Sequence, residues 1–337
     1  MVWYIIQTLC LLNMIKKLYF FLLSFSVVFF YSQQSTDSTQ AIADTQEYKI
    51  SEAETFVYKK PRVWDAVNKI PRNFVATATD FVSKPYYPYG LAAVGATLAL
   101  IPADPWLIKE SRNFGESLGL NEDHKYNKLG FLEIVPADAA SALYFIGNGT
   151  TVILISAGLG TYGLLKNDYR SQSTALQLLE SIAQAGLFVQ PLKRITGRES
   201  PFITFGDGRE HSYWKFAPSF SAYQKDTSRY DAMPSGHLTT AMAALTVLTE
   251  NYPEKKWLKP VGYTLLGLMS FEMMQSRVHW AADYPIAIFI GYLIGKNIAA
   301  SRITKSGKNM AQKSQYKISV AASSVYGYQT VGVNIQF

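Results

Sequence analysis

The sequence is poor in cysteine and histidine. Its only cysteine among 337 residues is Cys10, near the N-terminus, and it has four histidines. No group of these residues has the spacing of zinc ligands, and the chain shows neither a glycine-rich nucleotide loop nor an internal repeat. We therefore expect no metal and no other cofactor. The scarcity of cysteine is neutral about the redox compartment.

Positive charge is in modest excess. The net charge is +7, or +5 when Lys16 and Lys17 of the N-terminal segment are left out. Basic residues are scattered, with a mild excess in the tail, so nucleic acid is not an expected partner. Attraction to anionic lipid headgroups fits this distribution better.

The N-terminus predicts export. Two lysines precede an apolar run at residues 18–30, and small and polar residues follow, which is the pattern of a secretory signal peptide. We assign residues 1–32 to this peptide and expect cleavage near Ser32. A start at Met14 and an uncleaved anchor stay open as alternatives. Residues 33–84 are expected to form a linker and an N-terminal extension.

Six apolar segments, separated by Pro, Gly or charged residues, predict an all-α fold for residues 85–302. The segments are 89–103, 139–165, 174–191, 236–250, 258–274 and 284–300. Only 139–165 comfortably exceeds the roughly 20 residues that cross a bilayer. We favour membrane integration, with a soluble helical domain as the alternative. Residues 303–337 are predicted to form a basic linker and a short β-like tail, because apolar and polar residues alternate near the C-terminus.

The tripeptide Ser235-Gly236-His237 carries the first chemical signal. Pro234 precedes it and a run with helical periodicity follows it, so the tripeptide is expected at a helix N-terminus. Free backbone N–H groups at such an end favour an oxyanion, and Gly236 lets the backbone approach it closely. A phosphate group is the ligand that these features predict.

His279 and Asp283 form the second candidate group. In a helix, their spacing of four residues brings the imidazole within hydrogen-bonding reach of the carboxylate, which fixes the tautomer. Pro285 favours instead a helix that begins near Asp283, with His279 just outside it. The pairing is possible in either geometry. The structural alternative makes His279-Trp280 an interfacial aromatic pair and His237 a capping residue.

Three short motifs follow one another through the helical region. They are Lys193 with Gly197-Arg198 and Pro201, then Pro234-Ser235-Gly236-His237, then Ser276-Arg277 with His279-Trp280 and Asp283. This set resembles the signature motifs of the phosphatidic acid phosphatase type 2 superfamily, over about residues 85 to 300. That family includes lipid phosphatases, bacterial acid phosphatases and, with bound vanadate, haloperoxidases. The resemblance implies a helical bundle of about six apolar helices with the active site at one end.

The resemblance also implies a role for each residue. His279 is the nucleophile that forms a phosphohistidine, Asp283 orients it, and His237 protonates the leaving alcohol and then activates water. The residues expected to hold the phosphate oxygens are Lys193, Arg198, Ser235, Gly236 and Arg277. The other histidines, His124 and His211, are expected to be ordinary surface or loop residues.

Two positions depart from the family pattern. Ser200 stands where the first motif normally has an arginine, and Met273 stands where the third motif has one. Arg277 follows Met273 by four residues, which is one turn if this segment is helical, so we expect its guanidinium on the same face. Arg198 is the nearest alternative cation in the first motif. The loss of arginine at position 200 should weaken phosphate binding or change the substrate, and leave the nucleophile in place.

The favoured function is hydrolysis of a phosphate monoester or pyrophosphate, carried by a membrane lipid or an isoprenoid. The expected location is the inner membrane with the active site facing the periplasm, or the periplasm itself. One alternative is a catalytically degenerate protein that binds phospholipid or cell-envelope partners, and a less favoured one is a vanadium-dependent haloperoxidase. Residues 202–232, rich in aromatic side chains, are expected to form an irregular loop above the site. The substrate and the oligomeric state stay open.

Overall fold

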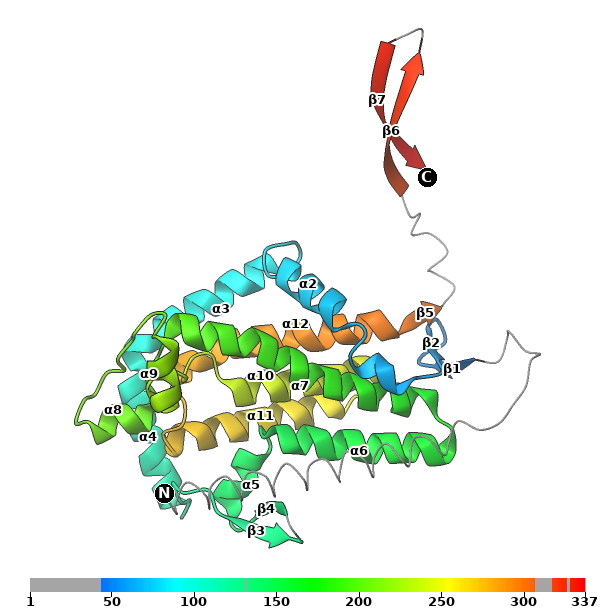
Figure 1. Cartoon of the computed structure of the whole chain (residues 1–337). Helices are drawn as coiled ribbons and strands as arrows, with labels where there is room; N and C mark the ends of the chain where they lie inside the picture. The colour runs from blue at the N-terminus through cyan, green and yellow to red at the C-terminus, as the bar shows by residue number, and fades with distance from the viewer. Residues whose placement is uncertain (1–43, 131, 307–316, 326–327, 337) are drawn as a thin grey trace, which may run out of the picture. The chain divides into compact units, whose positions relative to one another are not determined.

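The computed structural model describes residues 44–130, 132–306, 317–325 and 328–336. The predicted signal peptide lies outside these residues. The described chain is mainly helical, as the sequence predicts (Figure 1). Its α-helices are α2 (Ile70–Asp80), α3 (Tyr87–Leu100), α4 (Asp104–Ser117), α5 (Ala139–Phe145), α6 (Gly149–Lys166), α7 (Tyr169–Thr196), α8 (Pro201–Gly206), α9 (Phe220–Lys225), α10 (Gly236–Asn251), α11 (Leu258–Gln275) and α12 (Tyr284–Arg302). Short 3-10 turns are η2 (Val63–Ala66), η3 (Ile101–Ala103), η4 (Thr227–Arg229) and η5 (Ala281–Asp283).

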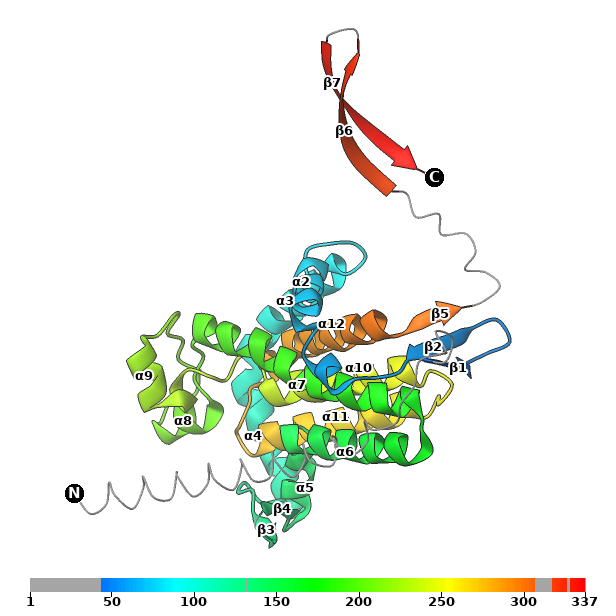
Figure 2. The same cartoon turned by 45° about the vertical axis from the view of Figure 1, so that its right-hand side comes forward.

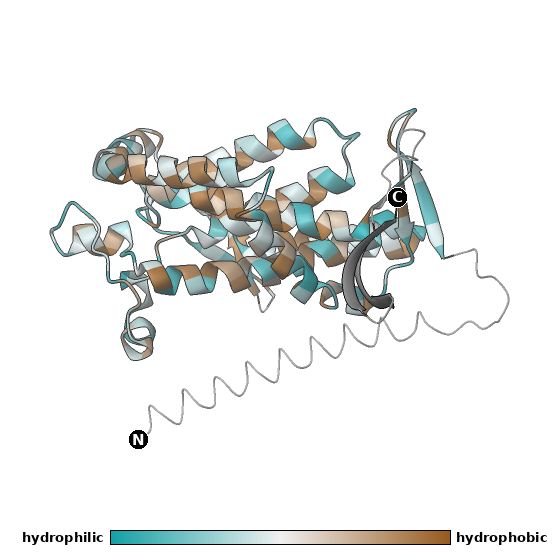
Figure 3. Cartoon of the chain, turned by 90° about the horizontal axis from the view of Figure 1, so that it is seen from above, coloured by the Kyte–Doolittle hydropathy of each residue, from teal (hydrophilic) through white to brown (hydrophobic). Residues whose placement is uncertain are grey.

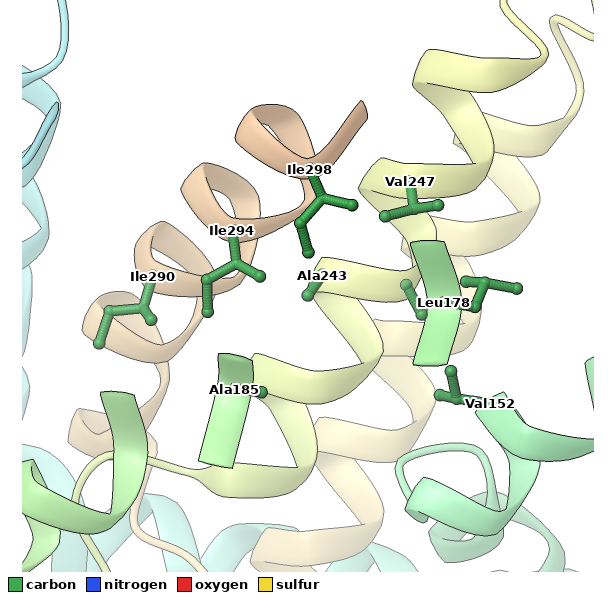
Figure 4. Packing of buried hydrophobic residues seen from close by; sticks show 9 residues of the cluster. Val152, Leu178, Ala185, Ala243, Val247, Ile290, Ile294 and Ile298 are labelled. Carbon is green, nitrogen blue, oxygen red and sulfur yellow. The ribbon is translucent and has the colours of Figure 1, made fainter. Parts of the chain in front are cut away.

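The main core lies where α7, α10 and α12 pack against one another (Figure 4). Leu178 of α7, Ala243 of α10 and Ile294 of α12 are fully buried at this contact, and Val152 of α6 packs against the same cluster. Each large aliphatic side chain buried in this way contributes about 1.5–3 kcal/mol to stability. These four helices therefore form the main packed core of the described chain.

Two glycines of α12 bring its backbone against that of α10. A Cβ atom at Gly291 would lie 2.6 Å from the carbonyl oxygen of Thr239, and one at Gly295 would lie 2.5 Å from that of Ala243. No larger side chain fits at either position. The close approach fixes the N-terminal half of α10 next to α12, and these are the helices that follow the second and third motifs.

A three-stranded antiparallel sheet lies at the N-terminal end of α7. Its strands are β1 (Thr45–Lys49), β2 (Thr55–Lys59) and β5 (Thr304–Ser306), in the order β1-β2-β5. Tyr58 of β2 packs with Tyr169 of α7, and its hydroxyl donates to Asn251 Oδ1 at 3.0 Å. Helices α8 and α9 lie at the other end of α7 in both views (Figures 1 and 2). The sheet and the motifs thus occupy opposite ends of the helical core.

The six predicted apolar segments correspond to helices, with one break and one extension. Residues 139–165 do not form one helix, because the chain bends by 69° between α5 and α6, where Asn148 Oδ1 caps α6 by accepting the N–H of Thr150 at 2.9 Å. The segment 89–103 continues instead through η3 into α4. The result is a helix of 31 residues, Tyr87–Ser117, which is mostly exposed.

Among the described residues, this 31-residue helix is the only single helix long and apolar enough to cross a membrane. The bent pair of α5 and α6 is a second candidate if the two helices together count as one span. Hydrophobic and hydrophilic residues are mixed along the helices (Figure 3). Six apolar segments were predicted, but in the described residues only one or two segments are long and apolar enough to cross a membrane.

Several elements were not predicted. Helices α2 and α4 were missed, as was the hairpin of β3 (Tyr126–Leu129) and β4 (Leu132–Pro136). Helix α4 contains Lys109, Glu110 and Arg112, so its sequence lacks an apolar run. The segment 202–232 is not wholly irregular, because it contains α9, η4 and most of α8.

The β-like tail is confirmed as a hairpin. Strands β6 (Lys317–Val325) and β7 (Tyr328–Gln336) pair antiparallel, with Lys317 opposite Gln336 and Val325 opposite Tyr328.

Candidate active site

Ser235-Gly236-His237 lies at the N-terminus of α10, as predicted. Ser235 is the N-cap residue, and its Oγ accepts the N–H of Leu238 at 3.3 Å. A Cβ atom at Gly236 would lie 3.9 Å from Lys193 Nζ. The last turns of α7 therefore bring a lysine ammonium to the glycine, where free N–H groups and the helix dipole already favour an anion.

His237 follows in the first turn of α10 and is largely buried. The centroid of its ring lies 6.2 Å from that of His279, and the two rings are inclined by 70°. Burial lowers the pKa of His237 to about 3, and electrostatic interactions with His279, Lys193 and His124 act in the same direction. His237 is therefore neutral at pH 7 in the free protein.

His279 is oriented by Asp283. The distance from His279 Nδ1 to Asp283 Oδ2 is 3.3 Å, and both side chains are buried. The same carboxylate oxygen accepts the backbone N–H of Trp280 at 2.9 Å. Because a carboxylate only accepts hydrogen bonds, Nδ1 carries the proton and Nε2 is the other ring nitrogen, available for reaction.

His279 and Asp283 adopt the predicted geometry in which a helix begins near Asp283 and His279 lies just outside it. Helix α11 ends at Gln275, and His279 lies in the connection, where its N–H donates to the Met273 carbonyl oxygen at 3.1 Å. Asp283 closes the turn η5 immediately before α12, and Pro285 occupies the first turn of that helix. The pairing of His279 with Asp283 thus depends on a loop held by the end of α11.

Arg198 lies differently from the expectation. Its Nη1 is 2.7 Å from Asp283 Oδ1 and its Nη2 is 2.5 Å from Asp104 Oδ2, and all three side chains are buried. Asp104 Oδ1 also accepts the N–H of Ala282 at 3.0 Å. The guanidinium is therefore bound by two carboxylates behind His279, which is a different environment from that of a phosphate ligand. Asp104, on the unpredicted helix α4, was missed by sequence reasoning.

Arg277 does not lie one helical turn from Met273, because α11 has already ended. The backbone of Arg277 has φ 58°, and its Nη2 is 2.5 Å from Glu122 Oε2. The sulfur of Met273 lies 3.9 Å from Ser235 Oγ. The position that carries arginine in the family pattern is thus beside the N-cap of α10, and a methionine fills it. Ser200 is buried at the start of α8, so no cation stands at that position either.

His124 is not an ordinary loop residue, whereas His211 is exposed as expected. His124 Nε2 lies 3.0 Å from Glu272 Oε1, and Glu272 is fully buried in α11. No sequence pattern signals this pair, because the two residues are 148 positions apart. Among the described residues, no group of three or more His, Cys, Asp or Glu side chains is placed to hold a metal ion.

Comparison with known proteins adds three similarities. Residues 174–310 match the model of the PAP2 superfamily. A lipid A 1-phosphatase of Porphyromonas gingivalis is 29% identical over 79 residues, which are 23% of this chain and 18% of the relative's length. The crystal structure of a transmembrane PAP2-type phosphatidylglycerolphosphate phosphatase from Bacillus subtilis is 14% identical, with a TM-score of 0.33, and the match covers 71% of this chain and 96% of that one.

The matched region contains all three motifs, with Lys193, Ser235-Gly236-His237 and His279 with Asp283 inside it. Residues 174–310 of this chain are therefore similar to the PAP2 superfamily.

Proposed function

We propose that this protein is a phosphatase that hydrolyses a phosphate monoester or pyrophosphate of a membrane lipid or isoprenoid through a phosphohistidine at His279. The observation that carries the proposal is the arrangement of two imidazoles at one helix N-terminus. His237 and His279 have ring centroids 6.2 Å apart, and His279 is backed by the buried carboxylate of Asp283. One ring nitrogen can attack phosphorus while the other imidazole handles the proton of the leaving group.

The reaction proceeds in two displacements. In the first, His279 Nε2 attacks phosphorus, the bond from phosphorus to the ester oxygen breaks, and His237 gives its proton to that oxygen. In the second, His237 takes a proton from water, the water oxygen attacks phosphorus, and the bond to Nε2 breaks to release inorganic phosphate. Asp283 stabilises the positive charge that develops on the His279 imidazole.

The first displacement needs a protonated His237, although its pKa is about 3 in the free site. A bound phosphate brings negative charge next to the imidazole, and an opposite charge at this range favours the protonated form. The substrate itself thus supplies the condition for general acid catalysis. Lys193 and the N–H groups at the start of α10 hold the phosphate oxygens, and Arg198 acts indirectly by fixing Asp283.

A lipid substrate fits the surface near the motifs. The segment after Lys193 exposes large aromatic side chains, with Phe216 71% and Phe220 68% exposed, and aromatic rings of this kind favour the headgroup region of a bilayer. The mostly exposed helix Tyr87–Ser117 is long enough to cross a membrane. We propose an exported protein at the inner membrane with its site toward the periplasm, and a soluble periplasmic enzyme is the alternative.

The test is phosphate release by the purified full chain in detergent, with phosphatidic acid, an isoprenoid pyrophosphate and p-nitrophenyl phosphate as substrates. We expect release in the presence of EDTA, inhibition by vanadate, and an acid-labile phosphoenzyme that His279→Ala abolishes. Release that disappears in EDTA and returns with a divalent ion would contradict the proposed chemistry. Activity in His279→Ala would contradict the nucleophile.

A non-catalytic lipid-binding protein is the second candidate. It is favoured by Ser200 and Met273, which stand at the two family arginine positions. Vesicle binding without release from any substrate would support it. Peroxide-dependent halide oxidation after vanadate loading would instead identify a haloperoxidase.

A further inference from the structure

The pair of His124 and Glu272 extends the candidate site away from His279. His124 lies between α4 and β3, and its Nε2 is 3.0 Å from Glu272 Oε1. Glu272 also accepts hydrogen bonds from Gln275 Nε2 at 2.9 Å and is fully buried. Because the carboxylate only accepts, His124 Nε2 is the donor, and the orientation of its ring is fixed by a buried partner.

Tyr144 lies between His124 and His237. The rings of His124 and Tyr144 are stacked, with centroids 3.9 Å apart and planes inclined by 16°. The ring of Tyr144 is 4.7 Å from that of His237, at 51°. Three rings thus form a row that starts at the buried carboxylate of Glu272 and ends at the imidazole proposed as the general acid.

The turn that follows Tyr144 also touches His237. Gly147 lies in the bend between α5 and α6, and a Cβ atom there would be 2.9 Å from His237 Cβ and 2.3 Å from the sulfur of Met269. The last turn of α5 lies against the ring of His237, and this bend lies against its Cβ atom. The 69° bend is what brings both contacts to the same residue.

His237 needs such a support more than His279 does. His279 has Asp283 to hold its ring, whereas the His237 side chain makes no hydrogen bond to any other described residue. Rotation of an imidazole about its side-chain bonds is then limited by packing alone. Proton transfer requires the ring nitrogen within hydrogen-bonding distance of the leaving oxygen, so free rotation would slow it.

We propose that His124, Glu272 and Tyr144 are positioning residues that hold the His237 imidazole for proton transfer to the leaving group. This inference rests on the proposed phosphatase function. Glu272 fixes His124, His124 holds the Tyr144 ring by stacking, and Tyr144 forms the wall against which His237 rests. None of the three residues belongs to the three sequence motifs.

The dependence of the rate on the leaving group distinguishes positioning of His237 from a general effect on protein stability. An alkyl phosphate needs a proton on its leaving oxygen, while p-nitrophenolate leaves readily without one. The second displacement is common to all substrates, so the comparison uses kcat/KM, which reports the first displacement only. A misplaced His237 should lower kcat/KM for an alkyl phosphate by roughly 10-fold to 100-fold and affect that for p-nitrophenyl phosphate much less.

The variants are Tyr144→Leu, which removes the ring, and Tyr144→Phe, which keeps it. We expect Tyr144→Leu to show the substrate-dependent loss and Tyr144→Phe to stay close to the wild type. His124→Gln keeps a donor for Glu272 but removes the stacked ring, so it should show the same selectivity and add little in a Tyr144→Leu background. If Tyr144→Leu fails to fold, His124→Gln still tests the proposal. His237→Ala shows the relative loss on the two substrates that is expected when the imidazole is absent.

The results distinguish failure of the proposed phosphatase function from failure of the positioning role. If the wild type releases phosphate from neither substrate, the proposed function fails and the inference falls with it. If the wild type is active and Tyr144→Leu and His124→Gln lose kcat/KM equally on the two substrates, or keep it in full, the inference alone is overturned. A loss of kcat/KM confined to the alkyl phosphate, matched by His237→Ala, supports it.

Discussion

Arg198 and Asp283 form a buried ion pair, with Nη1 and Oδ1 2.7 Å apart and neither side chain more than 1% exposed. The second guanidinium nitrogen binds Asp104, and the second carboxylate oxygen of Asp283 receives His279. Two buried carboxylates thus share one cation and one imidazole. Because buried charges are tolerated only when they are paired, each member of this group depends on the others.

Arg198→Lys tests whether Arg198 supports Asp283 or binds phosphate. Lysine keeps the charge but cannot bridge two carboxylates, so we expect a loss of about 1–3 kcal/mol in unfolding free energy and a fall in kcat with KM nearly unchanged. Denaturant unfolding and steady-state kinetics measure the two effects. Arg194→Lys, in the last turn of α7, is the matched control. A raised KM with unchanged stability would identify Arg198 as a phosphate ligand after all.

Arg277→Lys should change little. Its guanidinium is paired with Glu122 at partly exposed positions, and such ion pairs contribute about 0–1 kcal/mol. We therefore expect kcat/KM within about threefold of the wild type. A drop of tenfold or more would mean that Arg277 leaves Glu122 and grips the phosphate when substrate binds.

Anion binding should be accompanied by proton uptake. The pKa of His237 is about 3 in the free site, because of burial and neighbouring positive charge, so the imidazole is neutral at pH 7. Vanadate or phosphate next to it adds negative charge and raises this pKa, so a proton is taken up from solution. Calorimetry in buffers of different ionisation enthalpy counts the protons. His237→Ala should lower the uptake, and an unchanged count would contradict this coupling.

Gly147→Ala should disturb His237 directly. The added Cβ would lie 2.9 Å from His237 Cβ and 2.3 Å from the sulfur of Met269, so the bend must shift. Such overpacking costs about 1–3 kcal/mol, and kcat should fall with it. Gly149→Ala is the control, because nothing lies within 4 Å of a Cβ atom there. Equal behaviour of the two variants, in melting temperature and in kcat, would show that the bend does not support His237.

The local parts of the site could be predicted from the sequence. Ser235 as a helix cap and the reach of His279 to Asp283 depend on residues no more than four positions apart, where backbone geometry alone decides the neighbours. The apolar runs likewise predicted helices α7, α10, α11 and α12. The error at Arg277 arose at a helix end, since the turn after Gln275 is not visible in the apolar pattern.

The tertiary structure alone decided which distant charges meet. Arg198 lies 94 and 85 positions from its two carboxylates, and His124 lies 148 positions from Glu272. No periodicity relates residues so far apart, because their contact depends on how whole helices pack. The sequence by itself therefore determined the reacting groups and their immediate neighbours, while helix packing decided which buried partners hold each of them in place.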